Sequence, residues 1–486
     1  MSKSNSIKKN FIMNAILTVS SFLFPLITFP YVSRILLPEG TGKVSFATSV
    51  VTYFMMLSQL GIPMYGIRAC AKVRDDREAL SRTVHELLVI NLVMSLIAYI
   101  LLGGCVLLVP KLRAEKTLIF IISITIVLNA LGMEWLYKAL EQYTYITVRS
   151  MIFKVIGIIA MFALVHKRAD YVIYGGITIF AASASNIFNF IHAHKYIDVR
   201  PSGKNNFRRH IKPIMVFFAM SCATVIYTNL DTVMLGLMKS NADVGYYNAA
   251  VKIKGILVGI VTSLGAVMLP RLSYYIQQGQ KEEFGRLTQK AMNFVVLAAT
   301  PMMIYFMCFA KEGIFFLSGS AYTGSILPMQ IIMPTLLFIG MTNVMGIQIL
   351  VPLGREKSVL YSEIAGAVVD LIVNTILIPR YASAGAAIGT LLAEIVVWIV
   401  QLIALRDVVG NLYQQIRAGM ILAALALASV GCIWVKALPV GTIVCLFLSA
   451  LLYFGIYLLV LTLLREPLVR ELEEQAVTFF KSKTTV

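Results

Sequence analysis

Apolar residues in this chain of 486 residues gather into long runs that short polar segments separate. A helix needs about 20 apolar residues to cross the roughly 30 Å hydrocarbon core of a bilayer, and we count about 14 runs of that length. The pattern therefore predicts an all-α integral membrane protein with about 14 transmembrane helices. The predicted spans lie near residues 11–33, 44–66, 86–109, 117–137, 144–165, 171–191, 213–237, 245–272, 291–310, 325–351, 359–379, 384–405, 418–435 and 440–464.

Two stretches of the chain resemble each other at an offset of about 203 residues. The segment from Gly42 to Arg68 matches the segment from Gly245 to Arg271, and the following REALSR is echoed by KEEFGR. Two related halves in a hydrophobic chain are typical of transporters. We predict an N-terminal bundle, a basic cytoplasmic linker, a C-terminal bundle, two additional helices and a cytoplasmic tail, at residues 1–194, 195–212, 213–406, 407–464 and 465–486.

The first apolar run follows lysines and could be read as a signal peptide, but its sequence argues against cleavage. The run is too long for the apolar region of a signal, and it meets Pro30 and Arg34 instead of a small-residue cleavage site. We expect this span to be retained and the amino terminus to be cytoplasmic.

Loop charges test this orientation independently. With the amino terminus inside, about 28 Lys and Arg residues fall in cytoplasmic segments and about 11 in external ones, as the positive-inside rule requires. This bias, together with contact with anionic lipid headgroups, explains the formal charge of +18. The pattern places both termini in the cytoplasm. Nucleic acid is not an expected partner, because no soluble domain remains to bind it.

Several classes of function lack the residues they need. No loop exceeds about 25 residues and no Gly-x-x-x-x-Gly-Lys-Ser/Thr motif occurs, so direct use of ATP is not expected. The six cysteines are scattered without metal spacing, and His192 and His194 at a span end are typical of a solvated interfacial pair. We expect no catalytic residues, no metal site and no enzyme activity.

Three charged residues lie about 15 Å deep in their spans, near the bilayer midplane: Lys154, Asp370 and Glu394. A charge there costs at least about 2.5 kcal/mol unless it is paired or hydrated, so each must face the protein interior. Lys154 is favoured as a substrate contact. Asp370, with Asn374 one helical turn away, and Glu394 could each serve a cation or proton, or form structural hydrogen bonds.

Asp231 and Lys252 lie at similar depths in the seventh and eighth spans. They could form a structural ion pair or take part in transport, and both interpretations stay open. Lys254 points well away from Lys252, because successive helical residues differ by about 100°.

A family resemblance rests on several of these segments. FPLITFPYVSRILLPEGTGKVSFATS, LGIPMYGIRACAKVRDD, MEWLYKALEQYTYITVRS, YTNLDTVMLGLMKSNADVGYYNAAVKI and DLIVNTILIPRYASAGAAIGTLLAE resemble the polysaccharide-exporter branch of the multidrug, oligosaccharidyl-lipid and polysaccharide transporter superfamily. The resemblance runs from about residue 6 to about residue 405. It implies two six-helix bundles related by an axis along the membrane normal, enclosing a cavity, with two further C-terminal helices.

The resemblance also implies a function. Similar proteins are bacterial O-antigen, capsule or exopolysaccharide flippases, which move polyprenyl-pyrophosphate-linked oligosaccharides from the inner to the outer leaflet of the cytoplasmic membrane by alternating access. It makes the lipid-linked oligosaccharide and membrane lipid the expected partners, with polysaccharide polymerase machinery as a further candidate. Cationic cavity residues of such flippases could correspond here to Lys154, Lys252, Lys254, Arg34 and Arg68.

No cofactor is expected, although the resemblance makes coupling to a proton or sodium gradient plausible. Two rivals from the same superfamily stay open. A multidrug antiporter usually lacks the last two spans and favours an acidic, aromatic-lined cavity. A peptidoglycan-precursor flippase differs mainly in its sugar.

Overall fold

The structure is a computed structural model that describes residues 7–198, 205–407, 412–471 and 473–474. Residues 199–204 of the predicted linker and 475–486 of the predicted tail lie outside the described residues. Within the described residues all regular secondary structure is helical. The prediction of an all-α protein is confirmed.

Among the described residues, eleven helices are long and apolar enough to cross a membrane, and a bent pair, residues 320–332 and 335–350, meets at 47° and adds a twelfth candidate. Two of the long helices, α1 (Ile7–Gln59) and α16 (Glu356–Ala404), have 53 and 49 residues. At 1.5 Å per residue each is more than twice as long as a bilayer core is thick. Counting each of them as two spans gives a number consistent with the predicted fourteen.

Each of these two helices contains a break where two predicted spans meet. In α1 the break is at Leu37, with φ of 57°, directly before Pro38. Proline lacks an N–H and disfavours helical geometry in the residue before it. The helix continues through Pro25 and Pro30, so proline alone does not break it. In α16 the break is at Ala382, with φ of 48°.

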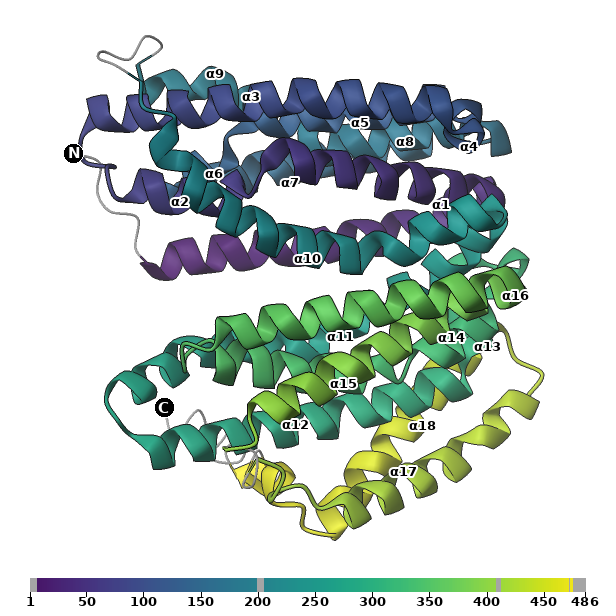
Figure 1. Cartoon of the computed structure of the whole chain (residues 1–486). Helices are drawn as coiled ribbons and strands as arrows, with labels where there is room; N and C mark the ends of the chain where they lie inside the picture. Colours follow the sequence, from purple (N-terminus) through teal and green to yellow (C-terminus); the bar gives the residue numbers. More distant parts are fainter. Residues whose placement is uncertain (1–6, 199–204, 408–411, 472, 475–486) are drawn as a thin grey trace, which may run out of the picture. The chain divides into compact units, whose positions relative to one another are not determined.

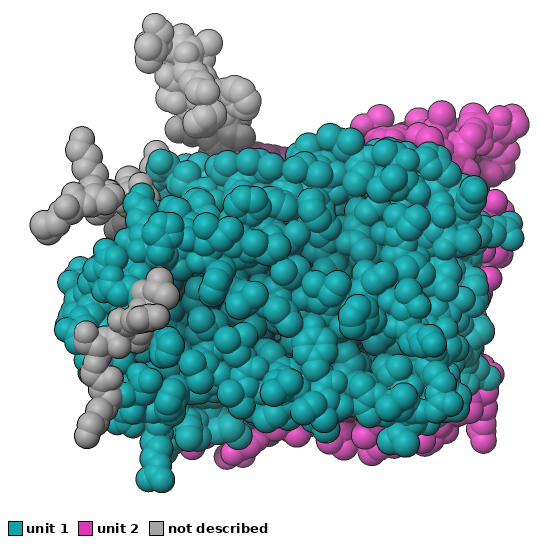
Figure 2. All heavy atoms as spheres, turned by 90° about the horizontal axis from the view of Figure 1, so that it is seen from above, with its two compact units in different colours: residues 1–245 teal, residues 246–486 magenta. Residues whose placement is uncertain are grey.

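The described chain divides into two compact units, residues 1–245 and 246–486, coloured separately in Figure 2. The first unit holds α10, which the repeat assigned to the C-terminal half, because α10 packs on α1 and α2. The predicted boundaries at residues 195–212 follow the repeat in the sequence and stay a prediction.

In the first unit, α1 is the central element and contacts α3, α5, α7, α8 and α10 (Figure 1). A buried cluster that includes Trp135, Leu136 and Tyr137 packs around α2 and α6. The other elements are α2 (Ile62–Ala71), α3 (Arg77–Leu108), α4 (Pro110–Ala114), α5 (Lys116–Gly132), α6 (Glu134–Ala139), α7 (Tyr143–Leu164), a 3-10 turn (Arg168–Asp170), α8 (Tyr171–Ile179), a π-helical turn (Phe180–Ala184), α9 (Asn186–His192), a 3-10 turn (Ala193–Lys195) and α10 (Arg208–Met238).

In the second unit, α12 packs against α15, α17 and α18, around a core that includes Tyr305, Phe309 and Tyr453. The start of the predicted tail is fixed to α12, because Asn293 donates to buried Glu466 at 2.9 Å and Lys290 pairs with Glu471 at 2.8 Å. The elements are α11 (Asn241–Gln277), which begins in the first unit, α12 (Lys281–Cys308), α13 (Ala310–Ser318), a 3-10 turn (Ser320–Ser325), α14 (Ile326–Ile332), α15 (Thr335–Asn343), a π-helical turn (Val344–Leu350), α16, α17 (Ala418–Ile433), a 3-10 turn (Trp434–Ala437) and α18 (Thr442–Leu463).

Candidate functional site

Lys154 is the predicted substrate contact, and the structure gives it only uncharged partners. Its Nζ donates to Ser20 Oγ at 2.8 Å and to Ser21 Oγ at 3.1 Å, so α7 is tied to α1 at this point. Both serine hydroxyls in turn donate to the carbonyl of Leu17. Across the described part of the chain, no carboxylate lies within ion-pair distance of Lys154.

The depth of Lys154 makes this arrangement unusual. It lies eleven residues into α7, which places it about 16 Å along the helix. A cation at such depth is costly unless its charge is compensated. Serine hydroxyls solvate an ammonium group but do not neutralise it. Lys154 is therefore a half-buried cation that can exchange its hydroxyl partners for an anionic ligand.

Arg149 is a second cation on α7 that the sequence analysis did not single out. Its guanidinium donates to the Ser185 carbonyl at 2.8 Å and to Asn186 Oδ1 at 3.4 Å, and the side chain is buried. Ser185 directly follows the π-helical turn of residues 180–184, a distortion that often occurs at functional sites. Arg149 and Lys154 are five residues apart and point about 140° away from each other, so they do not share one pocket.

A buried charge cluster at the end of the first unit where α3 begins was also missed. Glu86 is fully buried, and its carboxylate accepts from His210 Nε2 at 2.6 Å, from Arg209 at 2.8 Å and from the Asn206 N–H at 2.7 Å. Tyr65 on α2 hydrogen-bonds the other ring nitrogen of His210 at 2.8 Å. The sequence shows Glu86 only as the start of a predicted span, because its partners follow at least 120 residues later.

The two arginines predicted for the cavity lie elsewhere in the first unit. Arg34 is exposed on α1 and donates to the Pro30 carbonyl. It is 13 residues beyond Ser21, about 20 Å along the helix, and therefore far from Lys154. Arg68 is exposed in the last turn of α2. The structure does not gather these arginines and Lys154 into one site.

Lys252 and Lys254 lie on α11, both half-buried, with the buried Ile253 between them. Two helical residues apart, they face different sides, as predicted. Asp231 is buried on α10. The pairing of Asp231 with Lys252 stays a prediction.

Asp370 and Asn374 do lie together, on one buried face of the first half of α16. The second half packs directly on them, because a Cβ at Gly389 would lie 2.2 Å from Asn374 Oδ1 and 2.8 Å from Asp370 Oδ1. Thr390, the next residue, hydrogen-bonds Tyr247 at 2.8 Å. Glu394 is buried one turn later on the same half-helix. The second unit thus contains a buried acidic site formed by both halves of α16.

Comparison with known protein families shows which family the chain belongs to. Residues 7–276, more than half of the chain, match the family described as "Polysaccharide biosynthesis protein". The chain belongs to this family. A second family, MatE, matches residues 217–376 of this polysaccharide biosynthesis protein. The family resemblance of the sequence segments is confirmed.

Two curated relatives share nearly their whole length with this member of the family. A "Putative O-antigen transporter" of Escherichia coli (strain K12) is 25% identical over 408 residues, covering 83% of this chain and 97% of the relative. A protein of the same name from Shigella dysenteriae is 26% identical over 404 residues, covering 80% of this chain and 98% of the relative. Both are named as transporters and neither as an enzyme, which agrees with the prediction that this polysaccharide biosynthesis protein is not an enzyme.

A solved structure shares the fold. The lipid II flippase MurJ in an inward closed conformation matches with a TM-score of 0.71 and 15% identity, covering 94% of this chain and all of that one. At this level of identity the likeness concerns the fold alone. The helices long and apolar enough to cross a membrane and the transporter relatives together show a multi-pass membrane protein, and its helical fold is that of the matched structure.

Proposed function

We propose that this protein flips polyprenyl-pyrophosphate-linked oligosaccharide repeat units from the inner to the outer leaflet of a bacterial cytoplasmic membrane by alternating access, with both termini in the cytoplasm. The observation that carries the proposal is Lys154, a cation deep in a membrane helix whose partners are the hydroxyls of Ser20 and Ser21. Family membership and the transporter relatives support the same class of substrate.

The chemistry of the head group explains why such a lysine is useful. A pyrophosphate attached to several sugars cannot cross hydrocarbon unaided, because burying an uncompensated charge is prohibitive. An ammonium group already held by exchangeable hydroxyls can turn to a phosphate oxygen and form a charge-assisted hydrogen bond. Binding would then remove the uncompensated charge of Lys154 as well as that of the ligand.

The acidic site of the second unit is the proposed point of energy coupling. Asp370 and Glu394 are buried carboxyl groups on the two halves of one broken helix. Ionisable groups at such depth commonly mark ion or proton pathways. We expect a proton or sodium ion moving through this site to drive the cycle, while Asn374 supplies an uncharged oxygen beside Asp370.

Depletion of the protein in its native cell tests the proposal. Lipid-linked sugars are extracted and their leaflet is assigned with a membrane-impermeant glycan probe. The proposal expects complete oligosaccharide-pyrophosphate-lipid to accumulate on the cytoplasmic side while surface polymer is lost. Unchanged lipid-linked sugars with new sensitivity to cationic drugs would instead favour the multidrug antiporter that the sequence leaves open. Accumulation of the peptidoglycan precursor would favour a peptidoglycan-precursor flippase.

A further inference from the structure

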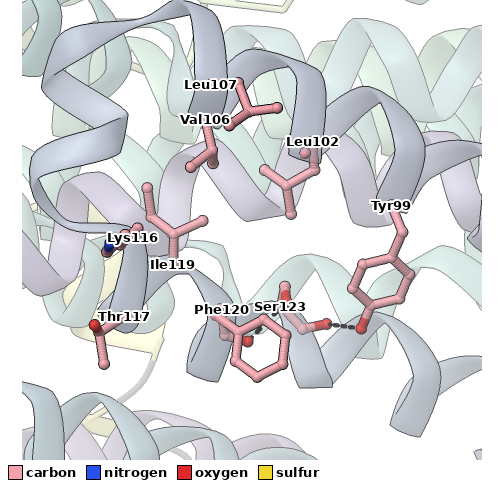
Figure 3. Close-up of a pocket in the computed structure, with 10 residues that line it drawn as sticks. Tyr99, Leu102, Val106, Leu107, Lys116, Thr117, Ile119, Phe120 and Ser123 are labelled. Carbon is pink, nitrogen blue, oxygen red and sulfur yellow. Dashed lines mark hydrogen bonds between the residues drawn. The ribbon is translucent and has the colours of Figure 1, made fainter.

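An apolar groove lies on the first unit between α3 and α5, apart from the charged sites described above. It has a volume of about 640 Å³. This is within the range of about 300–1,000 Å³ of small-molecule pockets. Figure 3 shows Lys116 near one end of the groove and Tyr99 near the other. The lining residues are Tyr99, Leu102, Gly103, Val106, Leu107, Lys116, Thr117, Ile119, Phe120 and Ser123.

The walls of the groove present hydrocarbon. The Tyr99 hydroxyl, the most polar group on the α3 wall, donates to the Ser123 carbonyl at 2.7 Å and is thereby satisfied (Figure 3). Leu107 and Phe120 are 66% and 70% exposed. In a membrane protein such exposed apolar side chains face lipid. From Tyr99 to Leu107 the α3 wall extends about 12 Å along the helix.

The groove owes its depth to a missing side chain. A Cβ at Gly103 would have no heavy atom within 4 Å, so this glycine leaves open space instead of allowing close helix packing. Its neighbour Gly104 is equally unobstructed but does not line the groove.

The charge at the end of the groove is available to a ligand. Lys116 is exposed, and the part of the chain that the structure describes provides it with no hydrogen-bond or ion-pair partner. The neighbouring Glu115 does not neutralise it, because that carboxylate pairs with Lys43 at 2.7 Å and accepts from Tyr171 at 3.0 Å. Lysine at the first residue of a helix also opposes the helix dipole, so local helix stability does not explain its position.

We propose that this groove is a binding site for an anionic membrane phospholipid, with one acyl chain between α3 and α5 and the phosphate at Lys116. Lys111 and Arg113 do not line the groove and donate to the Lys239 and Leu107 carbonyls, whereas Lys116 lines it. The site requires only that the protein spans a membrane, and it does not depend on the proposed transport substrate.

The test uses the full-length protein in phosphatidylcholine nanodiscs with a trace of photoreactive phosphatidylglycerol or phosphatidylcholine that carries a diazirine in the acyl chain. The readout is the fraction crosslinked to residues 99–123. We expect phosphatidylglycerol to label this segment about fivefold more than phosphatidylcholine, since one basic residue near a lipid surface contributes about 1 kcal/mol.

Two pairs of variants test the headgroup contact and the acyl-chain groove separately. Lys116→Gln should abolish the headgroup preference, while Lys167→Gln, an exposed lysine outside the groove, should leave it unchanged. Gly103→Phe fills the groove and should lower labelling by both lipids about tenfold, which corresponds to losing about two methylene contacts. Gly104→Phe is its matched control.

Equal labelling in wild type, Lys116→Gln and Gly103→Phe would overturn the proposal. It would also be overturned if an added polyprenyl phosphate displaced phosphatidylglycerol at equimolar amounts, because the groove would then hold the chain of the transported lipid. If Gly103→Phe does not fold, the proposal is tested by Lys116→Gln alone. Loss of the headgroup preference in that variant would support the proposal, and an unchanged preference would overturn it.

Discussion

Two charged sites in the first unit differ in how their charge is compensated. Around Glu86, the carboxylate has a counter-charge in Arg209 at 2.8 Å, and it also contacts His210 Nε2 at 2.6 Å. Around Lys154, the ammonium group contacts only the hydroxyls of Ser20 and Ser21. Both sites join segments more than 120 residues apart in the chain.

The difference separates a structural role from a ligand-binding one. Removing a fully buried carboxylate leaves its hydrogen-bond donors without their acceptor and destabilises a fold. Lys154 is half-buried and loses no counter-charge when it is replaced, so its retention in a membrane helix needs another reason. We therefore expect substitutions at Glu86 to reduce stability and substitutions at Lys154 to reduce transport.

The largest loss of stability is expected for Glu86→Gln. It removes the buried carboxylate that holds the start of α10 to α3 and weakens hydrogen bonds from Asn206, Arg209 and His210, which should cost about 3 kcal/mol. Thermal unfolding of the detergent-solubilised protein measures the change. Glu78→Gln, which breaks an exposed pair with Arg82 on the same helix, is the control and should cost less than about 0.5 kcal/mol. Equal effects of the two variants would contradict the structural role of Glu86.

The acidic site of the second unit offers an independent test of packing around buried charge. Gly389→Ala places a methyl group 2.2 Å from Asn374 Oδ1, and this overpacking should cost about 1–3 kcal/mol. Gly255→Ala on α11 meets no atom within 4 Å and should be neutral or slightly stabilising. Unfolding midpoints that do not differ between the variants would mean that the two halves of α16 are not packed at Asp370 and Asn374.

Arg149 is intermediate in character between Glu86 and Lys154. It has no carboxylate partner among the described residues, but its guanidinium holds the Ser185 carbonyl in a buried position. We expect Arg149→Gln to lower stability by about 1–2 kcal/mol, through loss of a charged hydrogen bond, and the folded fraction to transport normally. Thermal unfolding and transport are measured on the same preparation. Normal stability with lost transport would place Arg149 with Lys154.

Lys154→Gln should have the smallest effect on stability, within about 0.5 kcal/mol, because no ion pair is lost. Transport should fall at least about tenfold, since a hydrogen bond to a charged group contributes about 1.5–3 kcal/mol. The double variant Ser20→Ala/Ser21→Ala keeps the charge and removes the hydroxyls, so it should retain more transport than Lys154→Gln. If Lys154→Gln lost stability but kept transport, Lys154 would have a structural role and not the proposed ligand-binding role.

Sequence reasoning predicted the all-helical fold and placed Lys154 near the middle of a helix, because the length of an apolar run and the rise of a helix are local properties. It also placed Asp370 and Asn374 on one face, since they are one turn apart. It missed Glu86 and Arg149, whose positions near span ends resemble those of interfacial anchors. Only the fold brings His210 to Glu86 and Ser185 to Arg149.

The breaks in the long helices could be predicted only in part. Pro38 disfavours helix at Leu37, but Pro25 and Pro30 carry the same local signal and the helix continues through them. The local signal of a proline therefore does not by itself fix where α1 breaks. Ala382 has no proline after it, and its position becomes clear only when both halves of α16 are seen to meet at Gly389.

The central claim is that Lys154 binds the phosphate of a lipid-linked sugar during transport. The most direct measurement uses proteoliposomes that contain the purified wild-type or Lys154→Gln protein and the lipid-linked oligosaccharide isolated from depleted cells. An impermeant glycan probe reports the rate at which the sugar changes leaflet. We predict rapid transfer with the wild type and at least about tenfold slower transfer with Lys154→Gln at equal thermal stability. Equal rates for the two proteins would contradict the claim.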